Sequence, residues 1–161
     1  MVMLSPTSNL AESCNKIQEP LGRGDFMGII SLLKLKKYDD YVYRAVIYDE
    51  LFQTKKAIQV MESAVRNEKF NKKEIASGYI FLGILYSKIK DYGKASDCYN
   101  QGLELVIDEK IFYSSNFKKA IETFVKNGDI EKAKFWLDHL LERQSYDRKF
   151  KRLVKLKTKL D

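Results

Sequence analysis

The residues of this 161-residue chain that could carry out chemistry are few and widely separated. The single histidine, His139, has no cysteine, serine or carboxylate at the spacing of a nucleophilic motif, so we expect a structural or solvated role for it. The carboxylate pairs Asp39-Asp40 and Asp49-Glu50 are interpreted as a charged helix start and a solvated turn. The sequence has no glycine-rich phosphate loop and no metal-ligand cluster. We therefore expect no enzyme, no metal site and no cofactor.

Two other groups that could react have simpler structural interpretations. Cys14 and Cys98 are far apart and lack metal-ligand spacing, so we expect reduced thiols in a cytoplasmic protein. The tripeptide Arg23-Gly24-Asp25 matches an adhesion motif. Because no export signal is recognisable, we interpret it as a turn followed by a helix cap.

The strongest charge feature lies at the C-terminus. Between residues 141 and 161 there are eight Lys and Arg residues and three Asp and Glu residues, in a chain of formal net charge +7. The candidate basic patch comprises Arg148, Lys149, Lys151, Arg152 and Lys155. Two interpretations stay open: the solvated face of a capping helix, or a surface for an acidic partner or nucleic acid. Aromatic residues do not interleave with these cations after Phe150, which disfavours base stacking.

Composition indicates a helical domain. Hydrophobic residues make up 45% of the chain, and two prolines and eight glycines are too few for a turn-rich β-protein. No apolar run approaches the roughly 18–20 residues that cross a bilayer, so we expect no membrane insertion. The N-terminus resembles no secretory signal, and the cytoplasm is the expected location.

A fixed period organises these residues. Ala57, Ala95 and Ala133 are 38 residues apart, and a lysine precedes each of them. A large apolar residue follows each alanine by four positions, and an aromatic residue precedes it by nine; these are Met61, Tyr99 and Leu137, and Tyr48, Tyr86 and Phe124. Such self-similarity is typical of helical repeat proteins.

The middle unit has the spacing of a helix hairpin. Tyr79, Leu82, Gly83 and Tyr86 fall at i, i+3, i+4 and i+7, which is one face of a helix. Residues 90–93 break the pattern, and Ala95, Cys98, Tyr99 and Gly102 restart it as a second helix. We expect small residues at positions 83, 95 and 102 to let the two backbones approach closely, with aromatic rings filling the gaps.

This unit resembles the tetratricopeptide repeat, with its large, Leu-Gly, aromatic, Ala, aromatic and small positions. The flanking units match less well, because Arg44 and Ala120 replace the leucine and Ile121 replaces the glycine. Ile107 stands where a closing proline is often found. The resemblance implies an all-α fold, a right-handed α-solenoid of three helix hairpins over residues 38–147.

Caps are expected at both ends of this solenoid. Residues 1–8 are expected to fray, and residues 9–37 to form a degenerate leading hairpin. A basic C-terminal capping helix is expected over residues 145–161, with Ser145 as its cap. Its apolar face is predicted to contain Phe150, Leu153, Val154 and Leu160.

The resemblance also implies a function. In this family the first helix of each hairpin lines a concave groove that binds a peptide or protein segment. By register, the candidate groove residues are Tyr43, Val46, Ile80, Phe81, Ile84, Lys88, Lys119 and Lys126. The apolar centre of this set could instead pack against a neighbouring unit. Two alternative functions stay open: a nucleic-acid-binding accessory protein that uses the basic helix, and a self-associating assembly module.

Overall fold

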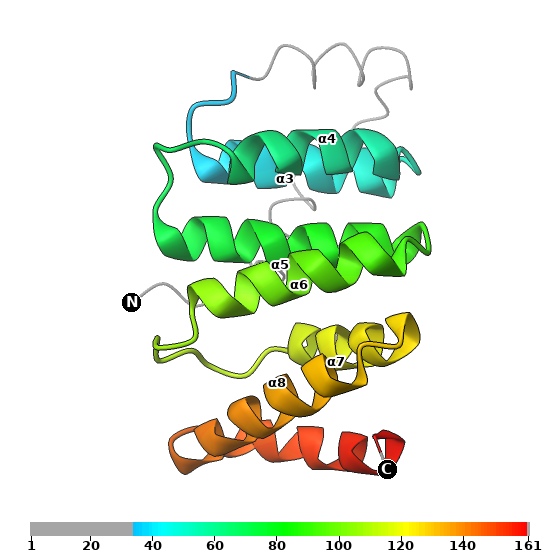
Figure 1. Cartoon of the computed structure of the whole chain (residues 1–161). Coiled ribbons are helices and arrows are strands. Elements are labelled where there is room, and N and C mark those ends of the chain that lie inside the picture. Colours follow the sequence, from blue (N-terminus) through cyan, green and yellow to red (C-terminus); the bar gives the residue numbers. More distant parts are fainter. Residues whose placement is uncertain (1–33, 161) are drawn as a thin grey trace.

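The structure, a computed structural model, describes residues 34–160, and every regular element within that range is helical (Figure 1). Three hairpins are stacked from the top to the bottom of Figure 1 and are followed by two 3₁₀ helices. The elements are α3 (Tyr38–Glu50), α4 (Thr54–Val65), α5 (Lys72–Lys88), α6 (Tyr92–Leu105), α7 (Ser115–Asn127), α8 (Ile130–Glu142), η1 (Arg143–Ser145) and η2 (Arg148–Lys159). The expected frayed segment 1–8 and leading hairpin 9–37 lie outside the described residues, apart from the last residues of the latter.

The second helices of the hairpins follow the 38-residue period without deviation. They begin at Thr54, Tyr92 and Ile130. The first helices are less regular, because α5 has 17 residues whereas α3 and α7 have 13 each. The extra length lies at the N-terminal end of α5 and is offset by the connection between α4 and α5, residues 66–71, which is shorter than the α6–α7 connection, residues 106–114.

Local capping explains where the middle hairpin begins and turns. The side chain of Asn71 accepts hydrogen bonds from the backbone N–H groups of Lys73 and Glu74, and Glu74 accepts one from Asn71 in return. Asp91 caps α6 by accepting from the backbone N–H of Lys94. The break expected at residues 90–93 is therefore confirmed at Lys90 and Asp91, whereas Tyr92 and Gly93 already belong to α6.

A left-handed residue recurs in every hairpin turn. Phe52, Lys90 and Gly128 have φ angles of 59°, 63° and 83°, and they are 38 residues apart. Only glycine adopts this region without a steric penalty, so the first two turns contain a strained residue that the third avoids.

The repeated positions form the core. Ala57, Ala95 and Ala133 are completely buried. A Cβ atom added at Gly83 would lie 2.8 Å from Cγ of Tyr99, so the small residue is what lets the Tyr99 ring face α5. A Cβ atom at Gly102 would lie 2.9 Å from the carbonyl oxygen of Ala76. The expected role of small residues in close helix approach is confirmed.

The C-terminal capping helix differs from the prediction in three respects. It is a 3₁₀ helix, and Asp147 caps it, not Ser145, which lies in η1. Phe150, Leu153 and Leu156 are buried at a spacing of three residues, whereas Val154 is exposed. A 3₁₀ helix has about three residues per turn, so Leu156 takes the inward place that an α-helical period gave to Val154.

Candidate interaction surfaces

The first helices form one layer of the stack, α3, α5 and α7, which we name the first-helix face. The backbone of α5 approaches those of both α3 and α7 directly. The second helices α6 and α8 are instead bridged by longer side chains, including the hydrogen bond of 2.7 Å from Trp136 Nε1 to Asn100. Closer spacing in one layer bends a stack toward that layer, so the first-helix face lies on its inner side.

The apolar candidate residues on this face are partly buried and partly open. Ile80 and Ile84 pack against the core formed by α6, α7, α8 and η2, and Phe81 packs against the core of the first two hairpins. Tyr43 and Val46 on α3 also have intermediate exposure. The fold thus brings a row of half-buried apolar side chains to the first-helix face, and Ile80, Phe81 and Ile84 each have one side against the core.

Lys88 contributes to the fold at the end of this face. Its ammonium group forms an ion pair with Asp49 at the end of α3. The Asp49 carboxylate also accepts a hydrogen bond of 3.0 Å from the Thr54 hydroxyl, and its side chain is only 9% exposed. The solvated turn expected at Asp49-Glu50 is wrong for Asp49, because that carboxylate joins two hairpins. The ion pair between Lys88 and Asp49 also removes much of the free charge expected at these two residues.

The two candidate cations of α7 are exposed but have different surroundings. Lys119 lies exposed in the middle of the helix. Lys126 lies over the Tyr92 ring, with Nζ 5.4 Å from the ring centroid, and so contacts the start of α6. Between them, Glu122 pairs with Lys159 of η2 at 3.0 Å. The C-terminal helix therefore borders the first-helix face at its third hairpin.

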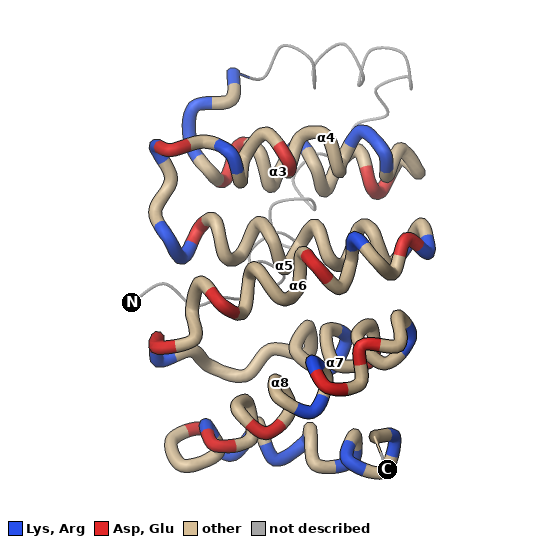
Figure 2. Tube along the Cα trace, in the orientation of Figure 1, with Lys and Arg blue, Asp and Glu red and all other residues tan. Residues whose placement is uncertain are grey.

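The predicted basic patch is on the outward side of η2. Figure 2 shows Lys and Arg along this helix, which contains no Asp or Glu. Lys157 pairs with Asp138 at 3.4 Å, and Lys159 pairs with Glu122. The other five cations, Arg148, Lys149, Lys151, Arg152 and Lys155, have no carboxylate among the described residues within 4.0 Å; we name them the basic face. They are the same five residues that the sequence predicts.

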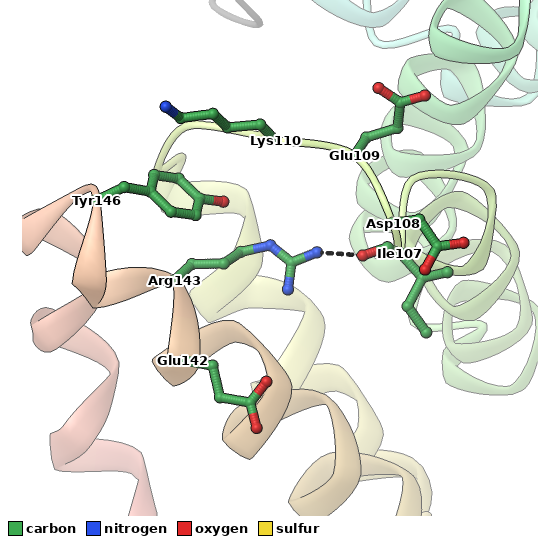
Figure 3. A pocket seen from close by; sticks show the side chains of 7 residues that line it. All are labelled: Ile107, Asp108, Glu109, Lys110, Glu142, Arg143 and Tyr146. Atoms are coloured by element: carbon green, nitrogen blue, oxygen red, sulfur yellow. Dashed lines mark hydrogen bonds between the residues drawn. The ribbon is translucent and has the colours of Figure 1, made fainter.

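A shallow cavity of about 430 Å³ lies where the 106–114 connection meets the end of α8 (Figure 3). Its central side chain is Arg143, which is only 7% exposed. The guanidinium donates to the carbonyl of Ile107 at 2.7 Å and to that of His139 at 2.9 Å. Lys110 and Tyr146 line the side of the cavity away from Ile107, and Nζ of Lys110 lies 5.2 Å from the centroid of the Tyr146 ring. Arg143 thus joins the 106–114 connection to the end of α8.

Of the residues that the sequence singled out for possible chemistry, Cys98 and His139 lie within the described range. Burial, aided by the negative charge of Asp97, raises the pKa of the Cys98 thiol to about 12. The His139 ring stacks on that of Phe135, with centroids 6.0 Å apart. No group of three or more His, Cys, Asp and Glu residues able to hold a metal occurs within residues 34–160. None of the helices in this range is long and apolar enough to cross a bilayer.

The sequence did not predict the hydrogen bonds that join the 106–114 connection to the C-terminal segment. Besides Arg143, the Tyr146 hydroxyl donates to the carbonyl of Ile111 at 3.0 Å. Asp147 accepts a hydrogen bond of 2.9 Å from the backbone N–H of Tyr113. All three bonds end on backbone groups, which carry no side-chain identity, so no pattern of residue types in the sequence reveals them.

Comparison with known proteins supports the repeat assignment. Residues 76–105, which cover most of α5 and all of α6, match the family model described as tetratricopeptide repeat. No curated protein matches the chain.

Proposed function

Because residues 76–105 match the tetratricopeptide repeat model, we propose that this chain is a non-catalytic module that binds a peptide or protein segment on its first-helix face. Repeats of this family are protein-interaction units, and the segment would lie along α3, α5 and α7. The observation that carries the proposal is the row of half-buried apolar side chains on the inner layer, Tyr43, Val46, Ile80, Phe81 and Ile84.

The arrangement of this row suits an amphipathic or extended segment. Ile80, Phe81 and Ile84 are held on one side by the core, so little conformational entropy is lost when their other side is covered. Lys119 supplies an exposed positive charge at the third hairpin. Lys88 and Lys126 are already contacted by the Asp49 carboxylate and the Tyr92 ring, so each would meet a bound segment together with that neighbour. The segment is therefore expected to be mainly apolar, with an acidic residue near α7.

Selection from a random peptide library displayed on phage tests this proposal. The full chain and a Tyr43→Ser variant are used in parallel, with a Phe135→Ser variant as control. Phe135 is 55% exposed on α8, in the opposite layer. The expected result is that linear peptides enriched on the full chain bind the control variant equally and bind Tyr43→Ser at least tenfold more weakly. Equal binding to all three proteins would overturn the proposal.

A Phe81→Asp variant separates binding from folding. Phe81 packs partly against the core of the first two hairpins, so its helicity and melting temperature are measured first. A folded variant that no longer binds the selected peptides supports the proposed face. A variant that loses helicity identifies Phe81 as a core residue, and Tyr43→Ser then decides the matter alone.

A further inference from the structure

Unpaired positive charge is concentrated on η2. The five cations of the basic face fall within eight consecutive residues, Arg148–Lys155, and no described carboxylate lies within 4.0 Å of them. A capping helix needs only a hydrophilic outer surface, which alternating charges would supply without mutual repulsion. The uniform sign of the charge therefore indicates an anionic partner.

The 3₁₀ geometry arranges these cations in rows. Side chains three residues apart lie above one another, at a separation of about 6 Å. Lys149, Arg152 and Lys155 form one such row, and Arg148 and Lys151 begin a second. Phe150, Leu153 and Leu156 hold the third row in the core, which fixes the orientation of the other two. Evenly spaced cations fit a polymer with evenly spaced negative charge, such as a phosphodiester backbone.

Aromatic side chains border the N-terminal end of the basic face. The guanidinium of Arg152 lies over the Tyr113 ring at 5.8 Å. The rings of Tyr113 and Tyr146 both meet Phe150 edge to face, with centroids 5.6 and 6.4 Å away. Tyr146 is 38% exposed. The fold thus supplies, from the 106–114 connection and residue 146, the aromatic residues that the C-terminal sequence after Phe150 lacks.

We propose that the basic face of η2, together with the neighbouring rings of Tyr113 and Tyr146, binds single-stranded nucleic acid. Cations that follow the backbone and aromatic rings that stack on bases are the combination such binding uses. An acidic peptide or an anionic membrane would contact the cations but offers no bases for stacking. A duplex keeps its bases inside the helix. Val154 is the one large apolar side chain exposed along η2, so the helix offers little apolar surface to a lipid bilayer.

Fluorescence anisotropy with a labelled 20-nucleotide oligo-dT tests the charge component. The full chain is titrated between 50 and 200 mM salt, and a Lys149→Gln/Lys155→Gln variant is compared with it. Each phosphate neutralised on a single strand contributes about 0.7 to the slope of log K against log salt. The double variant is therefore expected to lose about 1.4 of the slope and roughly 25-fold in affinity at 0.1 M salt. Lys55→Gln/Lys69→Gln, at two exposed lysines of the first hairpin and its following turn, is the matched control.

A second pair of variants tests the aromatic component. Tyr146→Leu is expected to weaken oligo-dT binding about tenfold and to leave the salt slope unchanged, because stacking involves no counterion release. Phe135→Leu, at an exposed aromatic residue of α8, is expected to bind like the full chain. Circular dichroism and melting temperature establish that each variant is folded.

Competing anions identify the class of partner. Poly-glutamate, a 20-base-pair duplex and phosphatidylserine vesicles are expected to compete at least tenfold less well than oligo-dT. A stronger effect of poly-glutamate would assign the basic face to an acidic protein, and a stronger effect of vesicles would assign it to a membrane surface. No binding of oligo-dT at 50 mM salt, or equal loss in the control variants, would also overturn the proposal. Tyr43→Ser is expected to keep full oligo-dT affinity, so this test is independent of peptide binding.

Discussion

The guanidinium of Arg143 donates a hydrogen bond of 2.7 Å to the carbonyl of Ile107, 36 residues earlier in the chain. Ile107 stands where repeats of this kind often end in proline, and here a buried side chain from the next hairpin fixes the backbone instead. The second hydrogen bond of Arg143, to His139, holds the end of α8. One side chain thus sets the position of the 106–114 connection relative to the start of the C-terminal helices.

Replacing Arg143 with methionine is expected to lower the free energy of unfolding by about 3 kcal/mol, because two hydrogen bonds from a charged donor are lost and buried carbonyls remain. Urea denaturation measures the effect. Arg148→Met, at an exposed position at the same end, is expected to change it by less than about 0.5 kcal/mol. Equal effects of the two substitutions would contradict the stabilising role of the two Arg143 hydrogen bonds.

Gly83→Ala is expected to destabilise the protein by about 1–3 kcal/mol, because its Cβ would lie 2.8 Å from the buried Tyr99 ring. Gly93→Ala is the matched control, since the nearest atom to its Cβ would be 3.9 Å away. Alanine is the better helix former, so this control is expected to be neutral or to stabilise by up to about 1 kcal/mol. Thermal unfolding distinguishes the loss of stability expected for Gly83→Ala from the neutral or stabilising effect expected for Gly93→Ala.

The recurrent left-handed turn predicts two opposite effects. Gly128→Ala is expected to cost about 1 kcal/mol, because alanine at φ 83° is strained. Phe52→Gly is expected to gain up to about 1 kcal/mol, because the Phe52 side chain is 93% exposed and contributes little packing at φ 59°. A loss of stability in Phe52→Gly would show that its ring has a contact that offsets the strain.

The 3₁₀ period of η2 predicts which of two neighbouring apolar residues matters. Leu156→Ala is expected to cost about 2–4 kcal/mol, since Leu156 is 3% exposed. Val154→Ala, at a side chain 43% exposed, is expected to change stability by less than about 0.5 kcal/mol. An α-helical C-terminus facing the core with Val154 would reverse this order.

Acid stability is expected to depend on Asp147. Hydrogen bonds from the backbone N–H groups of Tyr113 and Lys149 lower the pKa of its carboxyl below 3.8. A lowered pKa stabilises the folded state above pH 3.8, and this contribution is lost as the pH falls through the lowered value. The melting temperature of the full chain is therefore expected to exceed that of Asp147→Asn at pH 6, with the difference shrinking toward pH 2. Asp108→Asn, at an exposed carboxylate of the same connection, is expected to follow the full chain.

The interior of the hairpins could be predicted from residue types alone. The 38-residue recurrence of alanine, aromatic and small residues identified buried positions, because each must fit the same space in successive hairpins. The basic face could be predicted as well, since a run of cations without acids cannot be buried. The predicted role of the first-helix face in binding stays a proposal.

The C-terminal helix shows where sequence patterns stop being sufficient. Phe150, Leu153, Val154, Leu156 and Leu160 fit an α-helical period and a 3₁₀ period almost equally well. The core that α7 and α8 offer decides between them, and the stacked rings of Phe117 and Phe150, 5.8 Å apart, are part of that contact.

By itself, the sequence determined the repeat, the buried side of each hairpin and the site of the unpaired charge, because these depend on the period and the type of side chains. Only the tertiary structure decided that Asp49 and Lys88 join two hairpins, that Arg143 holds Ile107 and that Tyr113 borders η2. These contacts join residues distant along the chain, and one of them ends on a backbone group. The energy of such contacts is set by distance in space, which no local pattern specifies.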